Sequence, residues 1–224
     1  MMFDRTYILI IAAAVFSMWA SWRVSHTYDQ YSRVASRSGI TAAEAARQIL
    51  QNNGIFDIQI KRTAGKLSDR YVPSKKEIYL SDPDSTSIAA IGVAAHECGH
   101  AIQYHTAYLP LKLSHALSPI CAIGSNLGIP VLIAGMIFSI GGLVDIGIIL
   151  FSLGFLISVI TLPVEYNASN RALDILENYH ILREEEIPGT RKVLRAAGLT
   201  YVAAAAASLA SLLRLILLTR RNDN

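Results

Sequence analysis

The sequence predicts a mainly α-helical membrane protein with about four transmembrane helices and one small α+β portion. Hydrophobic residues make up 52% of the 224 residues and charged residues only 17%, whereas soluble domains carry about 25% charged residues. Four long apolar stretches alternate with polar sequence, and the polar part contains a His-Glu-x-x-His pattern. The formal net charge of +3 is weak, and no basic stripe interleaved with aromatic residues accompanies it, so we expect no binding to nucleic acid.

The first apolar stretch, residues 7–22, is predicted to be an uncleaved transmembrane anchor. It is at the lower end of the roughly 17–25 residues that a membrane-spanning helix needs. A cleaved signal peptide is the competing interpretation. The preceding residues are only weakly basic, and no small-x-small cleavage site follows. Trp19 and Trp22 are typical of the aromatic belt at a membrane interface.

The segment 26–106 is predicted to form the compact α+β portion. Thr41, followed three residues later by Glu44, predicts a capping box at the start of a helix that ends at Gly54. Residues 55–60 alternate between apolar and polar and predict a strand, and turn-forming residues precede a second short strand. The elements expected after the first helix are strands at 55–60 and 76–80 and a helix at 87–105.

The remaining apolar stretches predict a membrane hairpin and a final span. Stretches 117–138 and 143–163 are joined by a turn too short for anything but an antiparallel hairpin. Pro130 and several glycines are tolerated in such helices. Residues 164–198 are predicted to be a helical segment that carries the third ligand, followed by a span at 199–218. We expect the whole chain, 1–224, to form a single membrane domain.

The distribution of Lys and Arg predicts a multi-pass protein of the cell membrane with its active site on the cytoplasmic side. Basic residues follow the first span and lie between the third and fourth spans, whereas the hairpin turn has none. This distribution places both long loops in the cytoplasm, although Arg220 and Arg221 then fall on the opposite side, and only Arg5 precedes the first span. The basic residues that enter this prediction are Arg23, Arg33 and Arg37 after the first span, and Arg171, Arg183, Arg191, Lys192 and Arg195 between the third and fourth spans.

The pattern His96-Glu97-Cys98-Gly99-His100 predicts a zinc site. Positions i and i+4 lie on one helix face, so both imidazoles can bind one Zn²⁺ ion. Glu97 is about 100° round the helix from His96, where it can act as general base on a metal-activated water. The alternative is two ordinary surface or core histidines. Apolar flanks predict a buried helix, in which such polar groups need partners, and Gly99 suits a close crossing by another element.

A catalytic zinc ion usually has three protein ligands and one open position, so a third ligand is needed. The extended third-histidine pattern is absent, because Thr106 stands at its last position. His105 points to another helix face, and His115 lies close to the second span. Glu165 is the better candidate, because the two spans between it and His100 return the chain to the same side. The competing interpretation of Glu165 is an ordinary interfacial carboxylate.

The chain resembles the YugP-like membrane zinc metallopeptidases in several separated blocks. The blocks are VAAHECGHAIQ, KEIYLSD, the helix opening at 38–41, LPVEY at 162–166 and KVLRAA at 192–197 with TYVAA after it. The resemblance implies a zincin-like integral-membrane endopeptidase of the gluzincin type. It implies that His96, His100 and Glu165 are zinc ligands and that Glu97 is the catalytic acid and base.

The sequence departs from this family pattern near the third ligand. The family usually has Asp where this chain has Asn167, and the HtpX-like relatives have Asp where Ser169 stands. The side chain that orients a ligand histidine therefore stays open among Asn167, Ser169 and Asp174. Both cysteines, Cys98 and Cys121, are expected to be buried free thiols.

These features predict a membrane-embedded endopeptidase that cleaves a protein or peptide substrate near the cytoplasmic face of the lipid bilayer. Strand 77–80 could pair with an extended peptide, or could be an ordinary edge strand. The alternative function is a catalytically inactive zinc-binding scaffold or quality-control adaptor. A metal transporter is disfavoured, because the spans contain almost no ionisable residues. Arg171, Tyr166 and His180 remain candidates for the oxyanion donor, and the sequence predicts no oligomeric state.

Overall fold

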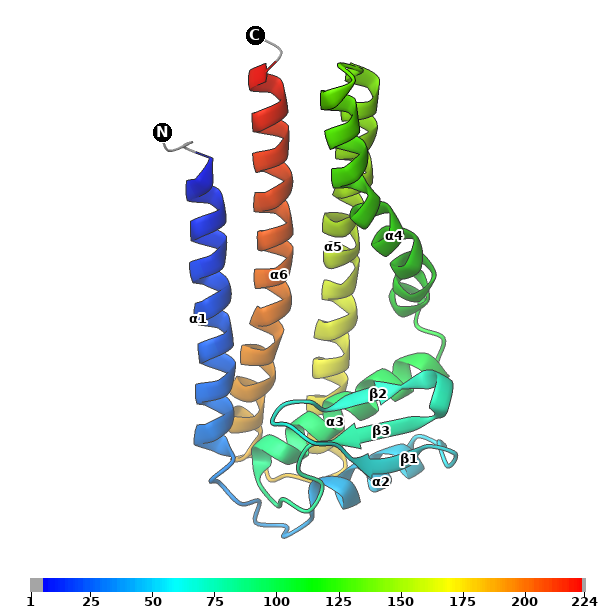
Figure 1. Cartoon of the computed structure of the whole chain (residues 1–224). Coiled ribbons are helices and arrows are strands. Elements are labelled where there is room, and N and C mark those ends of the chain that lie inside the picture. Colours follow the sequence, from blue (N-terminus) through cyan, green and yellow to red (C-terminus); the bar gives the residue numbers. More distant parts are fainter. Residues whose placement is uncertain (1–5, 223–224) are drawn as a thin grey trace. The chain divides into compact units, whose positions relative to one another are not determined.

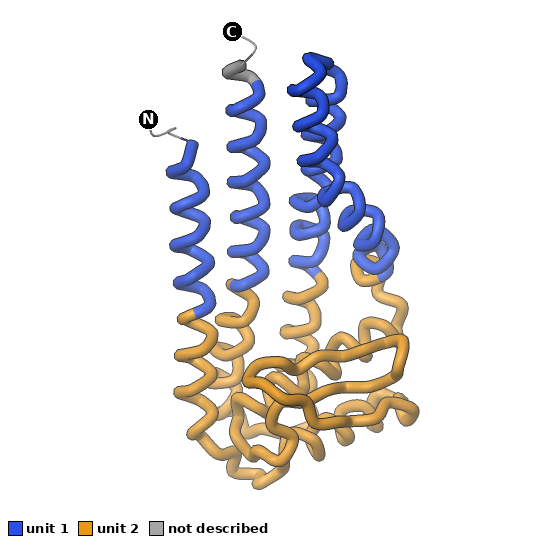
Figure 2. The backbone as a smooth tube through the Cα atoms, viewed as in Figure 1, with its two compact units in different colours: residues 1–21, 112–163, 200–224 blue, residues 22–111, 164–199 orange. Residues whose placement is uncertain are grey.

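The computed structural model describes the backbone of residues 6–222 and the side chains of residues 6–219. Six α-helices, three strands and one short 3₁₀ helix follow one another in the described part of the chain, and Figure 1 labels the helices and strands. The chain falls into two compact units (Figure 2). Unit 1 consists of residues 1–21, 112–163 and 200–224, and unit 2 of residues 22–111 and 164–199. The side chains of Arg5, Arg220 and Arg221, which entered the orientation prediction, lie outside the described residues.

Four of the described helices are long and apolar enough to cross a membrane, which confirms the predicted number of spans. Each extends beyond its apolar stretch, because helical polar sequence continues past the hydrophobic part. Residues 164–198, predicted to be a helical segment, comprise the end of one long helix, a connection and the start of the next. The four helices are α1 (Tyr7–Tyr31), α4 (Leu109–Ile137), α5 (Gly141–Asn178) and α6 (Ile187–Asn222).

Helices α4 and α5 form the predicted hairpin in unit 1. A β-carbon at Gly128 of α4 would lie 2.6 Å from the backbone nitrogen of Phe151 in α5, so the two backbones approach too closely for any larger residue. At the turn, Ser139 adopts a positive φ of 53°, and the N–H of Ile140 donates to the carbonyl of Gly135 at 2.8 Å. This hydrogen bond satisfies the carbonyl of Gly135 at the end of α4.

Unit 2 contains the end of α1 and then helix α2 (Ala42–Asn52), whose predicted capping box is confirmed. The Thr41 hydroxyl accepts from the N–H of Glu44, and the Glu44 carboxylate accepts from the N–H of Thr41. A three-stranded sheet follows, formed by β1 (Gln59–Arg62), β2 (Arg70–Val72) and β3 (Glu77–Leu80), with the 3₁₀ turn η1 (Pro73–Lys75) before β3. The strand predicted at 55–60 begins only at Gln59, because pairing with β3 starts at this residue. Ile55 is buried in the core, and Phe56 is exposed.

The sheet order is β1-β3-β2, so β3 is the central strand. Strand β1 is parallel to β3, and β2 is antiparallel to it. The prediction that this strand has a free edge is therefore wrong. The covering strand, β2, has three residues in a polar stretch and is too short to produce a recognisable alternation. Ile78 and Leu80 are buried, and they anchor the sheet in the core.

Helix α3 (Ile88–His105) lies at the centre of the unit 2 core. The Ser87 hydroxyl caps it by accepting from the N–H of Ala90 at 3.2 Å. Its apolar residues pack with those of α2, the sheet and the end of α5 in one buried cluster, which confirms the predicted buried helix. The core members from α3 are Ile88, Ala90, Ile91, Ala94, Ala95, Cys98, Ala101 and Ile102.

Candidate metal centre

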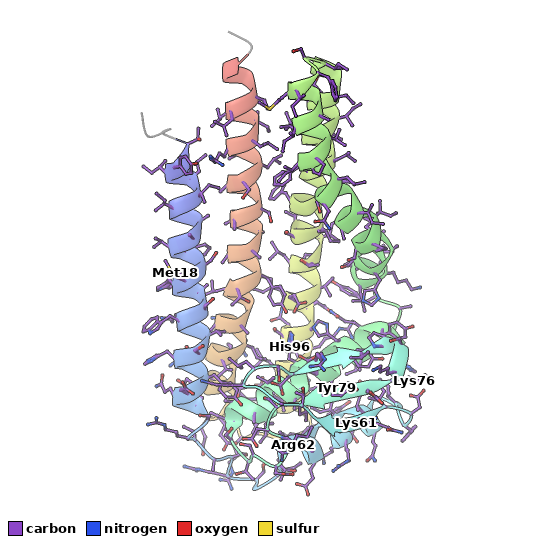
Figure 3. All side chains as sticks on the ribbon, in the orientation of Figure 1. Met18, Lys61, Arg62, Lys76, Tyr79 and His96 are labelled. Carbon is purple, nitrogen blue, oxygen red and sulfur yellow. The ribbon has the colours of Figure 1, made fainter. Side chains whose placement is uncertain are left out.

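Helix α3 brings three polar side chains of the predicted site into the interior of unit 2. His96, labelled in Figure 3, and His100 are one turn apart on α3, and Glu97 follows His96. Glu97 is only 7% exposed, and the side chains of His96 and His100 are 14% and 17% exposed. The helix is continuous and capped, so the relative positions of the three side chains follow from its geometry alone.

Helix α5 supplies the third predicted side chain. A β-carbon at Gly99 would lie 2.6 Å from the carbonyl oxygen of Ala168, which confirms the close crossing predicted at this glycine. Ala168 is one helical turn beyond Glu165, so the crossing brings Glu165 to the histidine pair. Its Oε2 atom is 3.4 Å from Nε2 of His96 and 3.5 Å from Nε2 of His100.

The spacing of these three atoms fits a tetrahedral zinc site. The two Nε2 atoms are 3.2 Å apart. Two ligand atoms about 2.0–2.1 Å from one ion and at a tetrahedral angle are about 3.3–3.4 Å from each other. The three observed separations agree with this value within about 0.2 Å, the tolerance expected of a metal site. Residues His96, His100 and Glu165 therefore have the chemistry and spacing to hold Zn²⁺.

A buried atom without a partner supports the same interpretation. Oε2 of Glu165 is buried and makes no hydrogen bond, because its distances to the imidazoles exceed the usual range. A buried carboxylate oxygen without a donor is costly. A cation among the three atoms would supply the missing interaction.

Hydrogen bonds hold the outer nitrogens of both imidazoles. Ser169 Oγ is 3.1 Å from Nδ1 of His96, and Oε1 of Gln103 is 3.0 Å from Nδ1 of His100. Of the three residues left open by the sequence, Ser169 contacts a histidine, Asn167 contacts Gln103, and Asp174 is exposed. Sequence reasoning missed Gln103, although its spacing of three residues from His100 places both on one helix face.

The pKa of the Glu97 carboxyl is raised above its ordinary value, and burial is the largest cause. The two nearby histidines and a backbone hydrogen bond from Tyr71 act in the opposite direction. A raised carboxyl pKa makes Glu97 a stronger base than an exposed glutamate. Such a shift is what proton transfer near neutral pH requires.

The other candidate residues occupy different surroundings. Cys98 is buried, and its Sγ lies 3.6 Å from the carbonyl oxygen of Ala46 in α2; the pKa of this thiol is raised by burial. Both cysteines are buried and free, as predicted. His105 and His180 are exposed. Tyr166 of α5 faces Gly198 of α6, and the oxyanion donor stays a prediction.

Comparison with known proteins identifies relatives over nearly the whole chain. A family model described as "Putative neutral zinc metallopeptidase" matches residues 6–220. The chain is 43% identical over 220 residues to "Putative membrane protease YugP" of Bacillus subtilis (strain 168), covering 96% of this chain and 98% of that protein. No solved structure matches the chain.

Proposed function

Because the chain belongs to the neutral zinc metallopeptidase family, we propose that it is a membrane-embedded, zinc-dependent endopeptidase. It hydrolyses peptide bonds near the cytoplasmic face of the cell membrane. The observation that carries this proposal is the convergence of ligand atoms from His96, His100 and Glu165, next to the buried carboxyl of Glu97 on the same helical turn. This set provides metal ligands and a proton acceptor together.

The three ligand residues would hold Zn²⁺, and Glu97 would move the proton. When bound, zinc supplies Lewis-acid activation of a water molecule and of the scissile carbonyl. The Glu97 carboxylate accepts the proton of the attacking water. It later donates that proton to the nitrogen of the leaving amine, so Glu97 ends the cycle as it began. Its burial keeps bulk water from competing for the carboxylate.

Strand β2 is the part of unit 2 best suited to bind an extended substrate. It is one of the two edge strands of the sheet, it packs against α3, and the backbone of Tyr71 contacts the Glu97 carboxylate. An extended peptide that adds to this edge gains backbone hydrogen bonds independent of its sequence. We therefore assign peptide binding to β2 in place of β3.

The cytoplasmic location rests on the positive-inside rule. The eight basic residues on which the orientation prediction was based belong to unit 2, which also contains the ligand residues. An accessibility assay on right-side-out vesicles tests this side assignment. A cysteine introduced at exposed Arg183 should react with an impermeant maleimide only after the vesicles are opened, whereas reaction in sealed vesicles would place the site outside.

A catalytically inactive zinc scaffold is the alternative function. A structural zinc site is normally closed by four protein ligands. The group identified among the described residues contains three, and the adjacent thiol of Cys98 faces α2. The arrangement of donors therefore favours a site with an open position over a closed structural one.

The variant Glu97→Gln tests the proposal in the purified full chain, reconstituted in lipid nanodiscs and loaded with zinc. The probe is a fluorescently labelled unfolded protein. We expect Glu97→Gln to retain stoichiometric zinc and to lose cleavage by roughly 10²–10⁴-fold, the usual contribution of a general base. Glu184→Gln, the same change at an exposed position, should cleave normally.

Two outcomes would contradict the proposal. Cleavage by Glu97→Gln at the wild-type rate would remove Glu97 from the mechanism. A wild-type chain that binds zinc stoichiometrically but cleaves neither the unfolded protein nor a peptide library would favour the scaffold.

A further inference from the structure

The side-chain amide of Gln103 is completely buried, with 0% exposure, and its orientation is determined by its neighbours. One end lies 2.8 Å from the carbonyl oxygen of Val164. A backbone carbonyl can only accept, so this end of the amide must be the Nε2 group, which donates. The same nitrogen lies 3.0 Å from Oδ1 of Asn167.

A second, independent contact leads to the same orientation. Nε of Arg171 donates to Oδ1 of Asn167 at 2.8 Å. A guanidinium has only donors, so the Asn167 atom that it contacts must be the oxygen. That oxygen also faces Gln103, and the Gln103 atom opposite it must again be the nitrogen. A flipped Gln103 would place two oxygen atoms 2.8 Å apart at Val164.

The remaining end of the amide, Oε1, lies 3.0 Å from Nδ1 of His100. An amide oxygen can only accept, so Nδ1 of His100 must carry the hydrogen. In the neutral ring, Nε2 then has a free lone pair, and it is Nε2 that approaches the other ligand atoms. Gln103 therefore selects the one tautomer of His100 that can bind a metal through Nε2.

His96 does not have this constraint. Its Nδ1 lies 3.1 Å from the Ser169 hydroxyl, which can donate or accept. Either tautomer of His96 is therefore compatible with its contacts, and in the metal-free protein its Nε2–H can donate to Nε2 of His100 at 3.2 Å. Only His100 is therefore held by its contacts in the tautomer that can bind a metal through Nε2.

Gln103 also acts on the third ligand residue. Its Nε2 group bonds the carbonyl of Val164, the residue immediately before Glu165. One side chain of α3 thereby holds both the ring of His100 and the backbone of α5 beside Glu165. We propose that Gln103 is a positioning residue, which presets the tautomer of His100 and holds Glu165 in register with it. This positioning role rests on the proposed zinc site, whereas the contacts of Gln103 exist without a metal.

The tautomer can be measured in the metal-free chain without any enzyme assay. The full-length protein is labelled with ¹⁵N-histidine in detergent micelles at a pH of about 9, where imidazoles are neutral. Ring nitrogen shifts distinguish a protonated Nδ1 from a protonated Nε2, and a His100→Ala sample identifies the signal among the six histidines. We expect wild-type His100 to carry its hydrogen on Nδ1.

Four variants separate this role from general packing. Gln103→Leu should shift His100 toward the Nε2–H form and weaken zinc binding by about 10–100-fold, measured by competition with a chelator. Asn167→Asp should preserve both properties, because a carboxylate still accepts from Gln103 and Arg171. Ser169→Ala should leave the His100 tautomer unchanged. Gln48→Leu, the same change at an exposed position of α2, should alter neither property.

The circular dichroism spectrum of each variant establishes that it is folded before comparison. The proposal is overturned if wild-type His100 carries its hydrogen on Nε2, or if folded Gln103→Leu retains the Nδ1–H form. It is also overturned if Gln103→Leu binds zinc as tightly as the wild type. Should the wild type bind no zinc, the proposed function fails, while the tautomer of the metal-free chain still decides the role of Gln103.

Discussion

Gly99 allows α5 to approach α3 at the candidate metal centre, and replacing it with alanine should separate them. The added β-carbon would lie 2.6 Å from the carbonyl oxygen of Ala168, whereas ordinary contacts begin at 3.4 Å. The obstacle is backbone within a helix and cannot rotate away. Relief of the overlap therefore needs a displacement of about 0.8 Å, several times the roughly 0.2 Å that metal–ligand distances tolerate.

The displacement should reach the ligands directly, because Glu165 is one turn before Ala168 on α5. We expect Gly99→Ala to weaken zinc binding by about 10–100-fold, the range seen when groups that orient metal ligands are disturbed. Overpacking costs typically 1–3 kcal/mol, and the better helix propensity of alanine offsets up to about 1 kcal/mol. The metal-free chain should therefore lose no more than about 3 kcal/mol of unfolding free energy.

Chelator competition measures the zinc affinity, and thermal unfolding in micelles measures the stability. Gly92→Ala is a control on the same helix. Its added β-carbon would lie 2.5 Å from the side chain of Thr190 and would not contact α5. It should lower stability and leave zinc affinity near the wild-type value. Gly142→Ala meets nothing within 4 Å and should change neither property. Wild-type zinc affinity in Gly99→Ala would refute the idea that this crossing positions Glu165.

Three further changes test the fold of unit 2. Thr41→Ala removes the cap of α2 and should cost about 1 kcal/mol of unfolding free energy, read as a lower melting temperature; an unchanged value would show that the cap contributes little. Glu186→Ala leaves two backbone N–H groups, those of residues 37 and 183, without their acceptor. It should cost about 2–3 kcal/mol in denaturant unfolding, and a loss below that of Thr41→Ala would contradict this role. The pKa of Glu77 is lowered from 4.5, chiefly by its hydrogen bond from Lys61. The stabilisation that ionised Glu77 provides is therefore present above pH 4.5 and is lost as the pH falls through the lower pKa of the folded chain. The melting temperature of Glu77→Gln should depend less on pH in this acidic range than that of the wild type, and an identical dependence would exclude the contribution.

Local patterns in the sequence were sufficient for several parts of the structure. The spans follow from runs of apolar residues, and the α2 cap follows from Thr41 and Glu44, because both depend only on neighbouring residues. The pairing of His96 and His100 follows from helical periodicity. The burial of α3 follows from the apolar residues that flank the motif.

Contacts between distant segments were beyond the reach of such patterns. The three residues of β2 form a strand only because they pair with β3, and this pairing removes the free edge expected for β3. The part of α5 after Glu165 is amphipathic, with Ala168, Ala172 and Leu176 buried. Its periodicity indicates a helix, but not that this helix shares a core with α3. Periodicity describes one element at a time, and it contains no information on which elements are neighbours.

The sequence by itself determined that this chain enters membranes and that a single helical turn carries two imidazoles and a glutamate. Only the tertiary structure decided how close the Glu165 carboxylate comes to that turn, and which atoms of Gln103, Asn167 and Ser169 surround the pair. The physical reason is range: helix periodicity acts over a few residues. The crossing at Gly99 joins residues more than 60 positions apart, and it forms only when the core packs.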